Sequence, residues 1–313
     1  MTPHLVLVGP TASGKTVLAV ELGLAAEAEV ISADALMVYR GADIGTAKPS
    51  MEERRGVRHH AIDLVEPAEE ADLATWLAAA RSALADCEAR GVNAIVTGGT
   101  GLYVQALVDA FELPGRYPEV RAELDDSPDR TEVMHARLAE LDPVAAARME
   151  PGNRRRVIRA LEVCLGSSRP FSSFGPGVAA FPANNRFVML GLAPDPGVLR
   201  DRIARRVNEQ AEAGLVDETA RLLTAPGGMS RTIRQGLGYK EVLMHLEDDL
   251  PLAEALALDV TNTRRFARRQ RAWFRRDPRI AWHDPGDDPL HLLKRFLSAW
   301  PPRSLLQARG SRP

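Results

Sequence analysis

Short apolar runs separated by helical patterns are the first feature of this chain. The runs lie at residues 4–8, 30–32, 92–97 and 186–192. After the first run, apolar residues recur at helical spacing over 16–28. Continuous apolar strands that alternate with helices are typical of a parallel sheet buried on both faces. The pattern therefore predicts an α/β fold, a parallel sheet with helices on both faces.

The middle of the chain has a different pattern. Strand signals are absent from residues 115 to 166, where helical patterns are interrupted at Pro128, Pro143 and 151–153. Residues 167–185 are rich in Ser, Pro, Gly, Phe and Asn, a composition that indicates a linker. The middle therefore predicts an inserted, mostly helical subdomain.

Helical spacing also marks the flanking regions. Helices are expected from about residue 102 and at 196–224, 237–247, 251–276 and 289–299, with a short apolar run at 280–282. These patterns predict a core formed by 1–114 and 186–300, an insert with its linker at 115–185, and a disordered tail at 301–313.

Composition indicates the size of the fold and the cellular compartment of the protein. The 313 residues are 45% hydrophobic, enough for one large domain or two unequal ones. Cys87 and Cys164 lack the spacing of a zinc site or a disulfide framework, so we expect buried thiols in a reducing compartment. The first residues lead directly into a strand, and no apolar run approaches the roughly 20 residues of a membrane span. We therefore expect a cytoplasmic protein that does not bind membranes. A monomer is also expected.

A glycine-rich loop carries the clearest chemical signal. It matches G-x-x-x-x-G-K-[ST] and lies between a predicted strand and a predicted helix, as a phosphate-binding P-loop requires. In such a loop, backbone N–H groups face an anion, the lysine contacts the terminal phosphate and the Ser/Thr hydroxyl binds Mg²⁺. The loop consists of Gly9, Pro10, Thr11, Ala12, Ser13, Gly14, Lys15 and Thr16. It predicts a P-loop-type fold and a polyphosphate ligand, with Thr16 as the metal ligand.

Two further residues follow predicted strands and should lie beside this loop. Ligands of open α/β sheets bind at the carboxyl ends of the strands, where Asp34 and Thr100 are placed. Asp34 is a candidate metal ligand or general base, with a helix N-cap as the alternative. Thr100 has the same alternative, because it lies in a Gly-Gly-Thr-Gly turn. The run at 92–97 ends without a carboxylate, which disfavours ATP hydrolysis and leaves Asp63 as the nearest substitute.

Arginines cluster near the end of the chain. Seven of the thirteen residues at 264–276 are arginine. On a helix, Arg264, Arg268, Arg271 and Arg275 fall within about 60° of one another. Although the formal net charge is −2, such a face favours a polyanionic partner. A solvated face paired with acidic neighbours and a membrane-binding helix are the alternatives.

Several segments together resemble the bacterial tRNA dimethylallyltransferases, of the IPP transferase family. The phosphate loop is one of them. The others, in chain order, are ISADALMVYRGADIGTAKP at 31–49, HHAID at 59–63, GGTGLY at 98–103, RALEV at 159–163, GYKE at 238–241 and RRQRAWFR at 268–275. The matches run from residue 4 to about residue 283. Within the first segment, Ala35 and Met37 stand where the family usually has Ser and Gln.

The resemblance implies a specific reaction. A dimethylallyl group would pass from dimethylallyl diphosphate to N6 of the adenosine 3′-adjacent to the anticodon, in tRNAs that read codons beginning with U. Asp34 would be the general base, Thr100 would bond the bridging oxygen of the departing diphosphate, and Arg121 would lie beside the reacting centre. Lys15, Thr16 with Mg²⁺, and Arg206 would neutralise the leaving group.

The same resemblance implies that the insert holds the tRNA anticodon stem-loop. The implied tRNA contacts are Asp34, Ala35, Leu36 and Met37; Arg155, Arg156, Val157, Ile158 and Arg159; Arg234, Gln235, Gly238, Tyr239 and Lys240; and Arg268, Arg269, Gln270, Arg271, Trp273 and Arg275.

Two other functions remain open on the residues alone. A P-loop kinase acting on a small metabolite would use the first 110 residues but has no evident use for the basic helix. A non-enzymatic RNA-binding sensor of nucleotides would keep the arginines but would not need Asp34.

Overall fold

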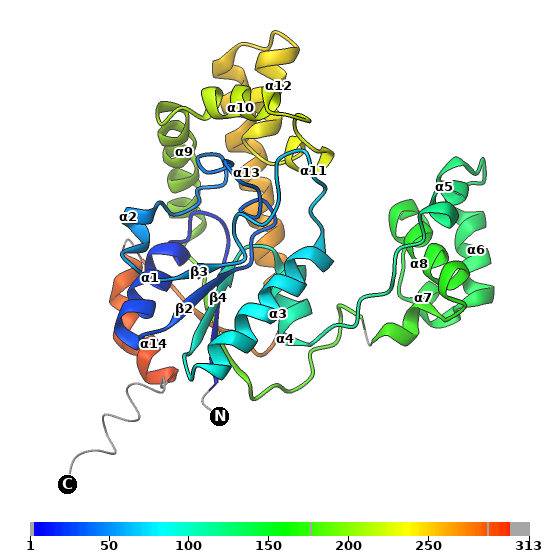
Figure 1. Cartoon of the computed structure of the whole chain (residues 1–313), viewed down its shortest axis with the longest axis horizontal. Helices are drawn as coiled ribbons and strands as arrows, with labels where there is room; N and C mark the ends of the chain where they lie inside the picture. Colours follow the sequence, from blue (N-terminus) through cyan, green and yellow to red (C-terminus); the bar gives the residue numbers. More distant parts are fainter. Residues whose placement is uncertain (1–2, 176, 287, 301–313) are drawn as a thin grey trace. The chain divides into compact units, whose positions relative to one another are not determined.

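The structure, a computed structural model, describes residues 3–175, 177–286 and 288–300 (Figure 1). Its described residues form two compact units, one made of the segments before Ala110 and after Ala180, and the other of Ala110–Ala180. The second unit therefore begins and ends about five residues earlier than the boundaries expected from the pattern. The expected disordered tail at 301–313 lies outside the described residues.

A parallel sheet organises the first unit. In its described part the sheet has six strands in the order β3-β2-β4-β1-β5-β6, and every pairing is parallel. The strands are β1 His4–Val8, β2 Glu29–Ser32, β3 His59–His60, β4 Ala94–Gly98, β5 Phe187–Leu192 and β6 Ala281–His283. The predicted α/β sheet is confirmed. Only β3 carried no apolar signal, because it is two residues long.

Helices cover both faces of this sheet. The connection from β1 to β2 and the connection from β3 to β4 run in opposite directions along the strand order. Because such crossovers are right-handed, their helices lie on opposite faces. On one face, Leu18, Leu22 and Phe296 share a core with the strands. On the other, Trp76 donates its indole N–H to Ser32 O at 2.6 Å. The helices concerned are α1 Lys15–Ala26 and α14 Leu293–Ala299, with the 3₁₀ helix η2 Pro289–Leu292, and α3 Leu73–Ala89 and α4 Gly101–Val108.

A helical group follows β5. α9 packs on α13, and α13 also packs on α12, which contacts α10. The prediction of continuous helix over 196–224 is wrong, because the helix is interrupted at Gly214. The φ of this residue is 100°, in the left-handed region, where an α-helix cannot continue. The group comprises α9 Pro196–Glu212, α10 Leu215–Thr224, α11 Arg231–Arg234, α12 Tyr239–Glu247 and α13 Leu252–Phe274. A short α2 Met51–Arg54, closed by a Ser50–Glu53 capping box, also had no distinct sequence pattern.

The second unit is helical and has its own small core. Leu138, Val157 and Leu161 are fully buried in it. Its breaks coincide with the predicted ones, since Pro143 is the first residue of a helix that Asp142 caps and Asn153 caps the next. The elements are α5 Pro118–Asp126, α6 Thr131–Leu141, α7 Pro143–Ala147, α8 Arg154–Ser167 and the 3₁₀ helix η1 Phe171–Phe174.

A buried carboxylate holds one loop of the first unit in place. Glu218 is 1% exposed and accepts the backbone N–H groups of Asp43 at 3.0 Å, Ile44 at 2.8 Å and Gly45 at 3.0 Å. The Tyr239 hydroxyl donates to the same carboxylate at 2.7 Å. Burial beside Glu218 raises the pKa of Tyr239 above its usual range, so that the phenol stays protonated and donating.

Removing this carboxylate should destabilise the first unit. In Glu218→Ala, three buried N–H groups lose their acceptor, and the free energy of unfolding should fall by about 3 kcal/mol or more. Urea denaturation followed by circular dichroism measures the change. Glu254→Ala, an exposed acid in the first turn of α13, is the matched control and should shift the midpoint little. An unchanged midpoint in Glu218→Ala would contradict the anchoring role.

Candidate active site

The phosphate loop lies between β1 and α1, as predicted. Gly14 has φ 88° directly before the first helical residue, Lys15. Gly9 lies so close to β5 that a Cβ there would come within 2.8 Å of Leu192 O. Ala12, also at positive φ, packs beside a small apolar cluster of Leu199, Ile203 and Ala267. The loop is thus supported from below by residues of α9 and α13.

Lys15 is buried within this loop. Its Nζ donates to Pro10 O at 2.6 Å and approaches Ser13 Oγ at 3.5 Å. Burial, together with the nearby positive charge of Arg206, lowers the pKa of Lys15 to about 7, whereas Asp34 acts in the opposite direction. The free protein therefore holds a lysine that gives up its proton near neutral pH, in the position where an anion would favour the charged form.

Arg206 of α9 reaches the loop from the other side. Its Nη1 donates to Thr11 Oγ1 at 3.0 Å. Burial lowers the pKa of Arg206 from its ordinary value, and the neighbouring charges of Asp34, Asp259 and Glu209 oppose that effect. The structure therefore brings Arg206 and Lys15 together, although they are far apart in the sequence. Two partly desolvated cations at one loop form an anion site.

Asp34 and Thr100 meet at the same edge of the sheet. Asp34 Oδ1 accepts the N–H groups of Leu36 at 2.9 Å and Met37 at 3.4 Å, which forms a turn and not a helix. Thr100 Oγ1 accepts the N–H of Ala35 at 3.1 Å and makes no hydrogen bond to the amides of α4. Neither residue is therefore a side-chain helix cap. The Thr100 hydroxyl keeps its own proton for donation, because it acts as acceptor toward Ala35.

The arginines of α13 form an unpaired basic face. Arg268, Arg269 and Arg275 are exposed, and Arg271 is half-buried. Within the described residues, none of the arginines at 264–276 forms an ion pair with an acidic side chain. The structure thus favours a partner with negative charge over an internally neutralised surface.

Comparison with known proteins places this arrangement in a family. A family model described as IPP transferase matches residues 37–277. The chain belongs to the IPP transferase family. It is 46% identical over 283 residues to a tRNA dimethylallyltransferase of Paenarthrobacter aurescens (strain TC1), with 90% of each chain covered. It is 44% identical over 291 residues to a tRNA dimethylallyltransferase of Pseudarthrobacter chlorophenolicus, covering 92% of this chain and 95% of the relative.

Solved structures of this family agree with the fold. A tRNA isopentenylpyrophosphate transferase from Bacillus halodurans superposes with a TM-score of 0.70 at 35% identity, covering 98% of this chain and 100% of that one. A eukaryotic dimethylallyltransferase, in crystallographic snapshots of its action on tRNA, superposes with a TM-score of 0.79 at 25% identity, covering 100% and 81%. The likeness to the family therefore spans both units.

Five of the residues expected to contact tRNA are buried in this structure, and their contact with tRNA stays a prediction. Val157 and Ile158 lie in the core of the second unit, and Tyr239 is fully buried against Glu218. Gly238 is buried, and Gln270 is 5% exposed. The cause is helical periodicity, because a continuous stretch of helix necessarily turns some of its residues inward.

The arginines of the second unit have defined partners. Arg121 on α5 bonds Asp125 at 2.6 Å and lies 3.8 Å from Glu162. Arg159 donates to the same Glu162 at 2.6 Å. Arg155 and Arg156 are exposed at the start of α8. Glu162, buried to 4% exposure, was not recognised from the sequence and orients two of the expected functional arginines.

The remaining expected contacts lie in the first unit. Gln235 is exposed next to α11, and Lys240 is half-buried in the first turn of α12. Arg234 pairs with Glu247 at 2.5 Å.

Oxygen ligands for a metal ion are few near the loop. Thr16 offers a hydroxyl at the start of α1, and the carboxylate of Asp34 acts electrostatically on Lys15. β4 supplies no acid at its end, where Thr97 Oγ1 donates to Leu7 O at 3.0 Å. Asp63 pairs instead with Lys48 at 2.6 Å. These residues fit Mg²⁺, which takes few protein ligands and otherwise binds phosphate oxygens and water.

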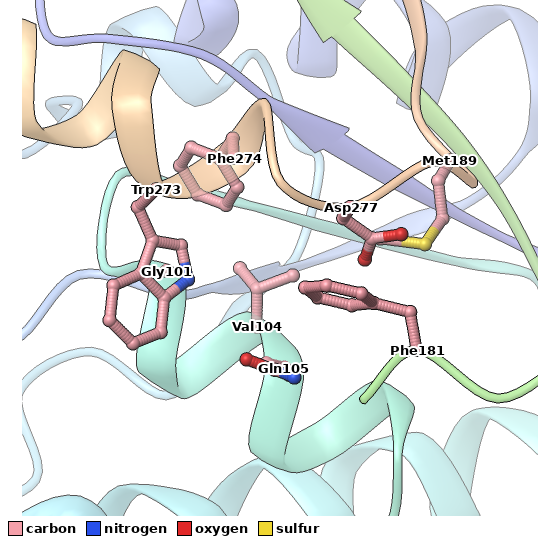
Figure 2. A pocket seen from close by; sticks show the side chains of 8 residues that line it. All are labelled: Gly101, Val104, Gln105, Phe181, Met189, Trp273, Phe274 and Asp277. Carbon is pink, nitrogen blue, oxygen red and sulfur yellow. The ribbon is translucent and has the colours of Figure 1, made fainter. Parts of the chain in front are cut away.

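A small cavity lies beside α4 and the end of α13 (Figure 2). It measures about 10 Å³ and is lined by Gly101, Val104, Gln105, Phe181, Met189, Trp273, Phe274 and Asp277. This space has room for no more than one water molecule, so it cannot hold a prenyl chain. Trp273 packs so closely on Gly101 that a Cβ at that glycine would lie 2.1 Å from its ring. The indole of Trp273, expected to contact tRNA, thus also fixes α13 against α4.

A second group of metal-ligand side chains lies at the amino end of β2. Glu29, His60 and Cys87 bring ligand atoms within 4.8 Å of one another. Arg90, however, donates to both oxygens of Glu29, at 2.8 and 2.7 Å. Burial raises the pKa of Cys87 to about 12, and both cysteines are free thiols. The cluster is an ion-pair network completed by protein groups.

None of the described helices is both long and apolar enough to cross a membrane.

The lowered pKa of Lys15 should make anion binding depend on pH. Above about pH 7 the lysine of the free protein is largely neutral, and a bound diphosphate favours its charged form, so binding should take up a proton. Affinity for inorganic diphosphate should therefore fall as the pH rises from about 7 toward the ordinary lysine value of 10.5.

Titration calorimetry in buffers of different ionisation enthalpy measures this uptake. Lys15→Arg keeps the positive charge but does not titrate in this pH range. Any proton uptake that remains when this variant binds diphosphate therefore comes from the ligand. Equal proton uptake by the two proteins would contradict a lowered pKa of Lys15.

Proposed function

We propose that this protein is a tRNA dimethylallyltransferase, which transfers a dimethylallyl group from dimethylallyl diphosphate to tRNA. The acceptor is N6 of the adenosine 3′-adjacent to the anticodon in tRNAs that read codons beginning with U. One observation carries the proposal: the anion site of Lys15 and Arg206 adjoins a carboxylate, Asp34, in a chain whose relatives are named for this activity. A kinase has no evident use for the unpaired basic helix, and an RNA-binding nucleotide sensor has no need of the carboxylate.

The chemistry balances with the groups present. The N6 nitrogen forms a bond to C1 of the dimethylallyl group, and the bond from C1 to the bridging oxygen breaks with its electron pair going to diphosphate. Asp34 takes the proton lost from N6. Thr100 donates its free O–H to the bridging oxygen, and its acceptor bond to Ala35 N–H holds it beside the Asp34 turn.

The leaving group acquires charge as this bond breaks. Lys15, Arg206 and the backbone N–H groups of the loop stabilise that charge, and they are preorganised because the loop is held by α9 and α13. Thr16 would hold Mg²⁺, which would supply further positive charge beside the leaving group. The role of Arg121 beside the reacting centre stays an expectation from the resemblance.

The tRNA binds through two basic surfaces. One is the face of α13 that carries Arg268, Arg269, Arg271 and Arg275, and the other is the start of α8 with Arg155 and Arg156. Phosphate contacts of this kind supply affinity without sequence preference, whereas the extruded adenosine is read in the pocket beside Asp34.

Transfer of labelled prenyl groups tests the reaction directly. The protein, incubated with radiolabelled dimethylallyl diphosphate and unmodified tRNA, should place label in the RNA. Asp34→Ala should lower the rate by about 10² to 10⁴, because the general base is lost, and leave tRNA affinity nearly unchanged. Asp217→Ala, an exposed acid on α10, is the control. Phosphate transfer from ATP without label in RNA would refute the function, and loss of tRNA binding by Asp34→Ala would refute the assigned role.

Salt dependence tests the basic helix. Each arginine of α13 that contacts a phosphate should lower the slope of log affinity against log salt by about 1 when it is replaced by alanine. Arg268→Ala and Arg271→Ala are the test variants, and Arg81→Ala on α3 is the control. Filter binding of tRNA at several salt concentrations gives the slopes. Equal slopes for all variants would rule out α13 as a phosphate-binding face.

A further inference from the structure

Gln270 is the buried residue in the centre of the arginine-rich segment. It lies on the inner face of α13 with Ala267 and Phe274, whereas Arg268 and Arg269 are exposed. Burying an amide is unfavourable unless both of its ends are hydrogen-bonded. The side chain must therefore have defined partners.

Those partners belong to the two halves of the site. Gln270 Oε1 accepts the N–H of Thr11, in the phosphate loop, at 2.8 Å. Gln270 Nε2 donates to Gly99 O, next to Thr100, at 3.0 Å. An N–H can only donate and a carbonyl can only accept, so the two partners also fix the orientation of the amide.

The approach of this side chain explains a glycine of the GGTGLY segment. A Cβ on Gly99 would lie 2.0 Å from Gln270 Nε2. A larger residue at this position would displace the amide from its bond to Gly99 O. The close contact therefore depends on two residues. One is Gly99, in the turn before α4, and the other is Gln270, the buried amide on α13.

One side chain therefore sets the spacing between three functional parts. These are the phosphate loop at Thr11, the turn that carries Thr100 beside Asp34, and the basic helix itself. Displacements of about 1 Å between reacting groups can cost on the order of 10²-fold in rate.

We propose that Gln270 is a positioning residue that couples tRNA binding on the basic face of α13 to the geometry of the diphosphate site. A polyanion bound to α13 holds the helix, and the amide transmits that position to Thr11 and Gly99. Coupling between the two ligands is reciprocal, so each should bind more tightly when the other is present. The inference rests on the proposed function for the nature of the polyanion, tRNA.

Binding measurements test the coupling without requiring catalysis. Inorganic diphosphate is titrated into the full chain with and without unmodified tRNA. The wild type should bind it about 5-fold or more tightly with tRNA present, whereas Gln270→Leu, which removes both bonds, should show a ratio near 1. Glu254→Leu places the same residue on the exposed first turn of α13 and should keep the wild-type ratio.

Turnover separates positioning from helix docking. Gln270→Leu should lower kcat by about 10²-fold, with the Kd for tRNA within about 2-fold of the wild type. Gln270→Glu gives a second readout. Its ionised form repels Gly99 O, whereas its protonated form restores both bonds. Its kcat relative to wild type should therefore rise as the pH falls from about 8 to about 6.

The outcomes distinguish this inference from the function. No coupling in the wild type, or equal coupling in wild type and Gln270→Leu, overturns the inference even if label is transferred to tRNA. A parallel loss of tRNA affinity and melting temperature in Gln270→Leu also overturns it, since the residue would then only dock the helix. Coupling that is lost in Gln270→Leu supports the inference, and wild-type protein that transfers no label refutes the function alone.

Discussion

The parallel direction of the strands is the constraint on which the rest of the structure depends. Because every strand runs the same way, the residues that follow β1, β2 and β4 emerge at one edge of the sheet. The phosphate loop, Asp34 and Thr100 come together there without any special folding of the intervening chain. α9 and α13 lie at the same edge, where Arg206 and Gln270 form hydrogen bonds to Thr11 of the loop.

Charge at this edge is organised for a ligand. Lys15 is buried and Arg206 is partly buried, and burial lowers the pKa of each. Partial compensation comes from Asp34, which acts on both. A diphosphate would relieve the remaining repulsion, and the same carboxylate would then face the acceptor. Repulsion between the two cations destabilises the free protein. Because a bound anion removes this repulsion, the repulsion increases the affinity for the anion.

The two faces of α13 serve different purposes. Its inner face carries Ala267, Gln270 and Phe274. Ala267 packs beside Ala12 of the phosphate loop, and Gln270 bonds both that loop and the turn before α4. Its outer face carries arginines that no acidic side chain in the described part of the chain neutralises. A single helix therefore links a surface suited to RNA phosphates with the centre of the reaction.

The sequence by itself determined the parts that depend on consecutive residues. The phosphate loop, the placement of Asp34 and Thr100 after strands, and the basic stripe of α13 follow from local pattern and could be predicted. The roles of Gln270 and Glu218 were decided only by the tertiary structure, because their partners lie 171 to 259 and 21 to 175 residues away along the chain. The positions of Val157 and Ile158 were also decided only by the tertiary structure. The resemblance marked both residues as functional, but they pack in the core of the second unit. The local sequence pattern predicts which face of a helix or strand is buried. Only tertiary packing decides which residues contact that face.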